Sequence, residues 1–160
     1  MQFSEMLTTD RIYVNPNWAY TFNKFELIRE LCQRICPLIP DNQCDCCEIE
    51  NAVLEREKKQ TTGIGEEVAM PHASLPCFQR PTSLLVILPR GYDFAAIDYK
   101  PVKFVILVLI PKGDTKLHLD TLACIARLFY NPDFRKQLSH AKTSQAAMQI
   151  IKQAEKESKI

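Results

Sequence analysis

Two runs of almost uninterrupted apolar residues, 83–88 and 102–110, constrain the fold of this chain more than any other feature. Each run is far shorter than the ~18 to 20 apolar residues of a membrane-spanning helix. Neither run alternates between apolar and polar residues, as a strand with one face in water does. The two runs therefore predict strands covered on both faces, with a turn between them at Pro89, Arg90 and Gly91.

Helices are predicted on both sides of these strands. Asn23, with Glu26 three residues later, indicates a capping box that starts a helix, and the prolines at positions 37 and 40 end it. Further helices are predicted over residues 45–59 and 117–130, over one or two turns at 132–138, and from a cap at Thr143 or Ser144 onward. The apolar face of the first helix is predicted at Phe25, Ile28, Leu31, Cys32 and Ile35, and that of the helix over 117–130 at Leu119, Leu122, Ile125, Ala126 and Phe129.

Helices before and after a run of strands indicate an α+β fold, an α/β/α three-layer sandwich with a mixed central sheet flanked by helices. Residues 11–14 and 68–70 add two short strands to the sheet. With 46% hydrophobic and 24% charged residues, a chain of 160 residues is ordinary globular material that can bury a core. We therefore expect a single domain over residues 1–160, with its core at about 3–152 and a frayed C-terminal tail.

The charge of the chain excludes some classes of function. A net charge of +1 gives no overall field for binding nucleic acid or acidic lipid. The N-terminus has no basic region followed by an apolar stretch, so no secretory signal is predicted. We expect a cytoplasmic protein with no nucleic-acid partner and no membrane insertion.

The seven cysteines suggest neither a disulfide framework nor a metal site. Their number is odd and no export signal is present, so reduced thiols are expected. Cys44, Cys46 and Cys47 form the only dense cluster, and no second pair of cysteines or histidines lies at a spacing typical of zinc sites. Neither a metal nor a cofactor is predicted, and the purpose of this cluster stays open.

The segment at residues 56–73 carries the residue types that phosphoryl transfer to a histidine needs. The neutral imidazole of His72 is a nucleophile, the guanidinium of Arg56 can hold phosphoryl oxygens, and the hydroxyl of Thr62 can donate a hydrogen bond. Gly65 and its neighbouring glycine allow the backbone to turn tightly and approach an anion. Pro71 lacks an N–H, so we expect it to end strand pairing and leave the imidazole at a rim.

This segment resembles the active-site signature of the enzyme IIA family of the bacterial phosphotransferase system, of the mannitol, fructose and nitrogen type. The signature runs from an Arg-Glu pair through T-x-x-G to Pro-His, at Arg56, Glu57, Thr62, Gly65, Pro71 and His72. A second block, F-A-A-I-D at 94–98 followed by Pro101 and Val102, is similar to the nitrogen-regulatory branch. The resemblance covers nearly the whole chain and implies the mannitol-type enzyme IIA fold.

The resemblance also implies roles for four residues. His72 corresponds to the phosphoryl acceptor, reacting through Nε2 without a metal, and His118 to a histidine that lies against the acceptor. Arg56 would clamp the phosphoryl oxygens, and the hydroxyl of Thr62 would bind phosphate or the ring of His72. Without the motif, each of these residues could equally be an ordinary packed, helix-terminal or loop residue. A fifth position, Glu67, departs from the glycine of many nitrogen-type members, and its carboxylate is expected to weaken anion binding somewhat.

The implied function is a phosphohistidine carrier whose partner is a small HPr-type phosphocarrier protein. One hypothesis is a regulatory component of the nitrogen type, in which phosphorylation changes the partner that is bound. A second hypothesis is a relay that passes the group to a sugar-specific IIB component of a fructose- or mannitol-class permease. A third is a scaffold of the same fold that is not phosphorylated, which the presence of His72 and Arg56 argues against.

Overall fold

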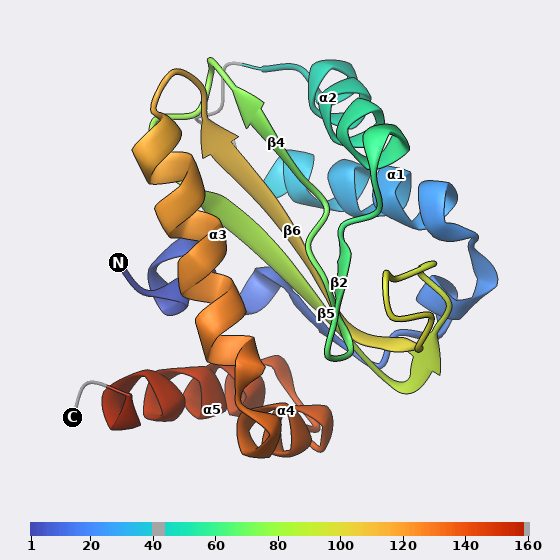
Figure 1. Cartoon of the computed structure of the whole chain (residues 1–160), viewed down its shortest axis with the longest axis vertical. Helices are drawn as coiled ribbons and strands as arrows, with labels where there is room; N and C mark the ends of the chain where they lie inside the picture. The colour runs from blue at the N-terminus through green and yellow to red at the C-terminus, as the bar shows by residue number, and fades with distance from the viewer. Residues whose placement is uncertain (40–43, 159–160) are drawn as a thin grey trace.

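A mixed sheet of six strands forms the centre of the structure, a computed structural model that describes residues 1–39 and 44–158 (Figure 1). The strands are β1 (Ile12–Val14), β2 (Gly63–Gly65), β3 (Val68–Ala69), β4 (His72–Leu75), β5 (Thr82–Tyr92) and β6 (Val102–Pro111). Their order is β1-β5-β6-β3-β2, and β4 also pairs with β6. β5 and β6 are antiparallel, whereas β1 is parallel to β5, and β3 and β4 are parallel to β6.

Helices cover both faces of this sheet. α1 (Lys24–Ile35) and α2 (Cys46–Lys59) precede the central strands, and α3 (Thr115–Tyr130), α4 (Pro132–Ser139) and α5 (Ser144–Glu157) follow them. Short 3₁₀ turns occur at Phe3–Met6, Thr9–Arg11, Asn17–Thr21 and Cys36–Leu38. The predicted capping box of α1 is present, since the Asn23 side chain accepts from the backbone of Glu26 and the Glu26 side chain accepts from the backbone of Asn23.

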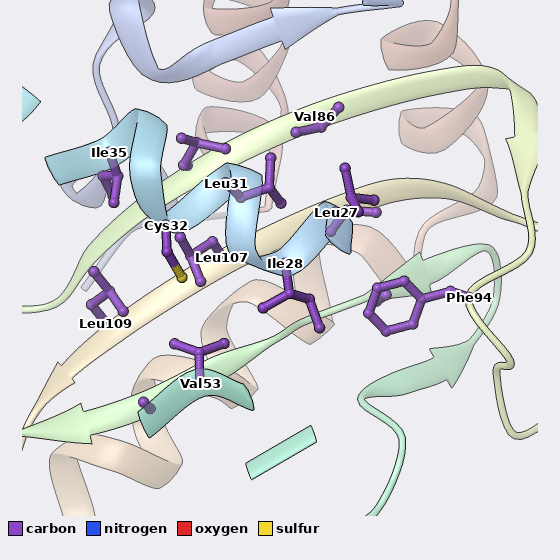
Figure 2. Close-up of a cluster of buried hydrophobic side chains, with 14 of the residues drawn as sticks. Leu27, Ile28, Leu31, Cys32, Ile35, Val53, Val86, Phe94, Leu107 and Leu109 are labelled. Carbon is purple, nitrogen blue, oxygen red and sulfur yellow. The ribbon is translucent and has the colours of Figure 1, made fainter. Parts of the chain in front are cut away.

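The two long strands are buried on both faces, as their uninterrupted apolar runs predict. Alternate residues of β6 enter different cores: Val105, Leu107 and Leu109 face α1 and α2, and Phe104, Ile106, Val108 and Ile110 face the C-terminal helices. Figure 2 shows the first core, where Leu27, Ile28, Leu31, Cys32 and Ile35 of α1 pack against Val86, Leu107 and Leu109 of the sheet. The α+β prediction of a mixed sheet between helical layers is therefore confirmed.

One detail of the strand prediction is wrong. The predicted turn at Pro89, Arg90 and Gly91 is part of β5, which continues to Tyr92 with a shift in its register to β6 after Ile87. An irregularity in one strand accommodates a proline and a glycine without ending the pairing. The connection to β6 instead spans residues 93–101.

Two predicted core residues are exposed. Phe25 and Leu119 have 40% and 61% of their surface accessible, although they fit the apolar stripes of α1 and α3. Helical periodicity gives the direction in which a side chain points, but not whether another element lies opposite it.

The cysteines also differ from expectation, because Cys44 and Cys77 form a disulfide with a Cα–Cα distance of 5.5 Å. The bond joins the start of α2 to the loop after β4, two segments 33 residues apart in the sequence. This distance is typical of disulfides. The odd count suggested reduced thiols, but only the folded chain shows that these two loops meet.

Candidate functional site

His72 is the first residue of β4, next to a two-residue interruption in strand pairing. β3 and β4 pair with β6 at one constant offset, Val68 opposite Phe104 and His72 opposite Val108. Only Met70 and Pro71 separate the two strands. Pro71 was expected to end the pairing, but its carbonyl accepts the N–H of Val108 at 2.9 Å, so the ladder resumes at once. A proline removes only a donor, and its acceptor still holds the strand to β6.

The ring of His72 is held in one orientation by the backbone of Met70, two residues earlier in the chain. Its Nδ1 lies 2.8 Å from the carbonyl oxygen of Met70, and the residue is 7% exposed. A carbonyl oxygen only accepts hydrogen bonds, so Nδ1 carries the hydrogen and Nε2 keeps its lone pair. The geometry therefore leaves Nε2 as the nucleophilic nitrogen.

The surroundings keep this ring neutral. Burial lowers the pKa of His72 most, and the guanidinium of Arg56 and the nearby ring of His118 lower it further. The carbonyl of Met70 and the carboxylate of Glu57 act in the opposite direction, but the pKa remains below its ordinary value. His72 is thus unprotonated near neutral pH, as a nucleophile must be.

His118 lies beside His72, in the first turns of α3. The two rings are 5.5 Å apart between centroids and meet at 73°, edge to face. Nδ1 of His118 lies 2.8 Å from Oγ of Ser74. Ser74 follows His72 by two residues in β4 and therefore shares its face of the strand. The sequence analysis missed Ser74, although this period-two spacing from His72 was a usable signal.

Arg56 extends from the last turn of α2 and is partly exposed. One N–H on its Nη1 donates to the carbonyl of Gln60 at 2.8 Å. The guanidinium has five N–H donors, so this bond fixes the group while others can meet an anion. Its positive charge lowers the pKa of His72.

Thr62 is buried and bonded to Glu57 rather than directed at the acceptor ring. Its N–H donates to Oε2 of Glu57 at 2.7 Å, and its hydroxyl donates to Oε1 of the same carboxylate. Glu57 also forms an ion pair with Lys24, whose Nζ lies 2.9 Å from Oε2. The single hydroxyl hydrogen of Thr62 is thus occupied in this arrangement, which differs from the expected bond to phosphate. Lys24 has no signal in the sequence, and Glu57 was noted only as part of the Arg-Glu pair.

The two motif blocks meet through a glycine. A Cβ on Gly63 would lie 2.7 Å from Cα of Ala96, and the carbonyl of Gly63 accepts the N–H of Ile97 at 2.9 Å. Any larger residue at position 63 would push the segments apart. The expected close approach of this glycine-rich stretch is therefore made to the second motif block of the same chain.

Comparison with known proteins agrees with this geometry. Residues 5–154 match the model of the family described as "Phosphoenolpyruvate-dependent sugar phosphotransferase system, EIIA 2". The chain belongs to this family. It is 35% identical over 129 residues to a nitrogen regulatory protein of Bradyrhizobium diazoefficiens, covering 81% of this chain and 82% of that one. It is 33% identical over 101 residues to a fructose-specific EIIA component of Haloferax volcanii, covering 63% and 66% of the two chains.

A solved structure of this fold is similar over most of its length. The nitrogen regulatory protein IIA-Ntr from Neisseria meningitidis superposes with a TM-score of 0.81 at 23% identity, covering 92% of this chain and 97% of that one. The likeness confirms the predicted IIA fold. None of the helices in residues 1–39 and 44–158 has the length and apolar character needed to cross a membrane.

Glu67, where many nitrogen-type IIA proteins carry glycine, lies in the turn between β2 and β3. Its φ of 68° is in the left-handed region, which glycine adopts without strain. The carboxylate forms ion pairs with Arg135 of α4 at 3.4 Å and with Lys103 of β6 at 3.3 Å. Two cations thus pair with the added charge. This pairing explains a glutamate at this position better than an effect on an anion bound at His72 would.

The remaining histidine and the cysteines lie outside this site. His140 is exposed just after α4. Within the part of the chain that the structure describes, no group of three or more His, Cys, Asp and Glu side chains is arranged to hold a metal ion.

Proposed function

We propose that this IIA protein is a phosphohistidine carrier, a protein phosphotransferase that accepts a phosphoryl group on Nε2 of His72. The observation that carries the proposal is the bond between Nδ1 of His72 and the carbonyl of Met70. It fixes the tautomer in which Nε2 has a free lone pair, while burial keeps the ring neutral. An HPr-type carrier with a phosphorylated histidine is the donor that the chemistry and the family support.

In the proposed reaction, Nε2 attacks phosphorus in line as the bond from phosphorus to the donor histidine breaks. The electron pair of that bond returns to the donor ring. Positive charge develops on the Nδ1–H side of His72, where the carbonyl of Met70 stabilises it. Negative charge on the equatorial oxygens is met by the guanidinium of Arg56 and by the ring of His118, which Ser74 orients.

Incubation with phosphoenolpyruvate, enzyme I and HPr tests this proposal. We expect one acid-labile, base-stable phosphoryl group on the wild type and none on His72→Ala. The matched control is His140→Ala, which removes an exposed histidine outside the site and should be labelled like the wild type. Full labelling of His72→Ala would refute the choice of acceptor.

For the biological role, we favour regulation over sugar transport. The nitrogen regulatory relative in Bradyrhizobium diazoefficiens and the second motif block support this choice. Exposed apolar side chains at Ile64 and Leu119, 42% and 61% accessible, offer a contact surface for partner proteins. A phosphoryl group adds nearly two negative charges, which are costly to bury against an apolar partner. The unphosphorylated form is then the one that binds a regulatory target, and phosphorylation releases it.

A pull-down that compares unphosphorylated and phosphorylated protein distinguishes the two roles. Regulation requires a partner that is recovered with one form and lost with the other. Equal recovery of every partner by both forms, together with transfer of the group to a sugar-specific IIB protein, would instead support the relay role. The similarity to a fructose-specific EIIA component keeps that alternative open.

A further inference from the structure

A buried carboxylate near the acceptor is bound by donors from two different parts of the chain. The side chain of Glu57 in α2 is fully buried. It accepts the N–H and the hydroxyl of Thr62 and an ion pair from Lys24 at 2.9 Å. A buried carboxylate is stable as an anion only when such donors compensate for its lost hydration.

Lys24 occupies a position that helix stability does not explain. It is the first residue of α1, where the helix dipole disfavours a cation. Its side chain is 15% exposed, and Nζ lies 5.0 Å from the centre of the Phe94 ring and 3.4 Å from Oγ1 of Thr61. The ion pair with Glu57 offsets the unfavourable free energy of burying this cation and of placing it at the N-terminus of a helix.

The Glu57 carboxylate connects to His72 through one continuous path of hydrogen bonds. The carboxylate holds Thr62, and the carbonyl of Thr62 accepts the N–H of Met70 at 2.9 Å. The carbonyl of Met70 in turn accepts from Nδ1 of His72 at 2.8 Å. Met70 lies in the interruption between β3 and β4, so the bond to Thr62 anchors the residue whose carbonyl holds His72.

We propose that Lys24 is a positioning residue for the phosphoryl transfer described above. Through its ion pair with Glu57, it holds Thr62, and Thr62 anchors the backbone N–H of Met70, so that the Met70 carbonyl stays in place and keeps the hydrogen of His72 on Nδ1. Lys24 touches neither the ring nor a bound anion; it acts through the intervening residues. This role rests on His72 being the acceptor, but its structural part, control of the His72 tautomer, exists without any phosphoryl donor.

Nearby ionisable groups could also change the pKa of His72, apart from the hydrogen-bond path. They are Arg56 and Glu57 of α2 and His118 of α3. Lys24 is not among them, so replacing it affects the ring through the hydrogen-bond path and through the charge state of Glu57. A residue that only stabilised the fold would leave the tautomer of His72 unchanged in the folded protein.

The test replaces Lys24 by methionine, which keeps the length of the side chain and removes the charge. The ring nitrogen chemical shifts of ¹⁵N-labelled His72 report the tautomer, and single-turnover labelling by phosphorylated HPr reports the rate. We expect the wild-type ring to carry its hydrogen on Nδ1, and Lys24→Met to shift it toward a mixture of tautomers. The transfer rate should fall by about tenfold, the scale of one lost hydrogen bond to a charged group.

Three further variants make the result decisive. Lys103→Met removes another lysine–glutamate ion pair, of 3.3 Å with Glu67, and should leave tautomer and rate unchanged. Lys24→Arg retains the charge and should stay within about threefold of the wild-type rate. The combined Lys24→Met and Glu57→Gln variant carries neither charge of this buried pair, and its amide oxygen can still accept from Thr62, so it should fold and recover the Nδ1–H form.

An unchanged His72 tautomer in folded Lys24→Met would overturn the proposal, whatever its rate. Equal slowing by Lys24→Met and Lys103→Met would do the same. If Lys24→Met does not fold, the other two variants decide. Loss of the Nδ1–H form of His72 in Lys24→Arg, or in the combined Lys24→Met and Glu57→Gln variant, would then refute the hydrogen-bond path. If even the wild type accepts no phosphoryl group, the function proposed above fails, while the ring shifts still decide whether Lys24 sets the tautomer.

Discussion

Arg135 of α4 should be one of the most important polar side chains for stability, and Arg135→Met tests this. The residue is 8% exposed. Its Nη1 donates to the carbonyls of Phe129 at 2.7 Å and Tyr130 at 3.0 Å, which belong to the last turn of α3. Carbonyls at a helix C-terminus have no partner within the helix, so the guanidinium caps α3. The same group reaches Glu66 and Glu67 in the turn between β2 and β3, both at 3.4 Å.

The two kinds of contact differ in size. Hydrogen bonds from a charged donor contribute about 1.5–3 kcal/mol each, and both carbonyls lose their donor in the variant. The ion pairs with Glu66 and Glu67 contribute ~0.2–1 kcal/mol each, because both carboxylates are accessible to water, which screens their charges. Methionine preserves most of the apolar stem. We therefore expect a loss of at least about 3 kcal/mol in the free energy of unfolding, or roughly 6 °C or more in Tm for a chain of this length.

Urea and thermal denaturation monitored by circular dichroism measure this loss. Arg127→Met, at an exposed arginine of α3, the helix that Arg135 caps, is the control and should change stability by less than about 0.5 kcal/mol. The combined variant Glu66→Gln and Glu67→Gln removes the ion pairs alone and should cost less than about 2 kcal/mol. The reasoning fails if this double variant is as unstable as Arg135→Met, because the ion pairs would then outweigh the helix cap.

Three further predictions concern the site and the cysteines. Arg56→Ala should slow transfer about ten- to a hundredfold and more than Arg56→Lys, because only a guanidinium holds two oxygens in one plane; equal wild-type kinetics in both would remove Arg56 from the site. NMR titration should give His72 a pKa below 6.5, so that stability falls as pH drops below 6.5, where the unfolded chain binds the proton first; a pKa at or above 6.5 would contradict the effect of burial. Alkylation of the unfolded chain without reductant should label five of its seven cysteines, with Cys44 and Cys77 protected, and Cys44→Ser should still be phosphorylated at the wild-type rate. Labelling of all seven cysteines would show that this disulfide does not form.

Short-range patterns in the sequence predicted much of the fold. The apolar runs that became β5 and β6 are buried on both faces because two helical layers cover the sheet, which is what uninterrupted hydrophobicity indicates. The cap at Asn23 was identified correctly, and Thr143 was one of two candidates for the last helix, since a capping side chain binds backbone N–H groups only two or three residues away. The signature around His72 predicted the family for the same reason: its residues are close together in the sequence.

Only the tertiary structure decided which partners these residues have. Phe25 and Leu119 fit apolar stripes, yet no element covers them enough to bury them. The hydroxyl of Thr62 suggested an anion contact, but a carboxylate from α2 occupies it, and that carboxylate in turn depends on Lys24, 33 residues earlier than Glu57. The sequence by itself determined the elements, the family and the candidate acceptor, because those depend on local spacing and residue chemistry. The ion pair of Lys24 with Glu57, the reach of Arg135 to Glu66 and the disulfide depend on segments far apart in the sequence, whose distances are set only when the sheet and its helices pack together.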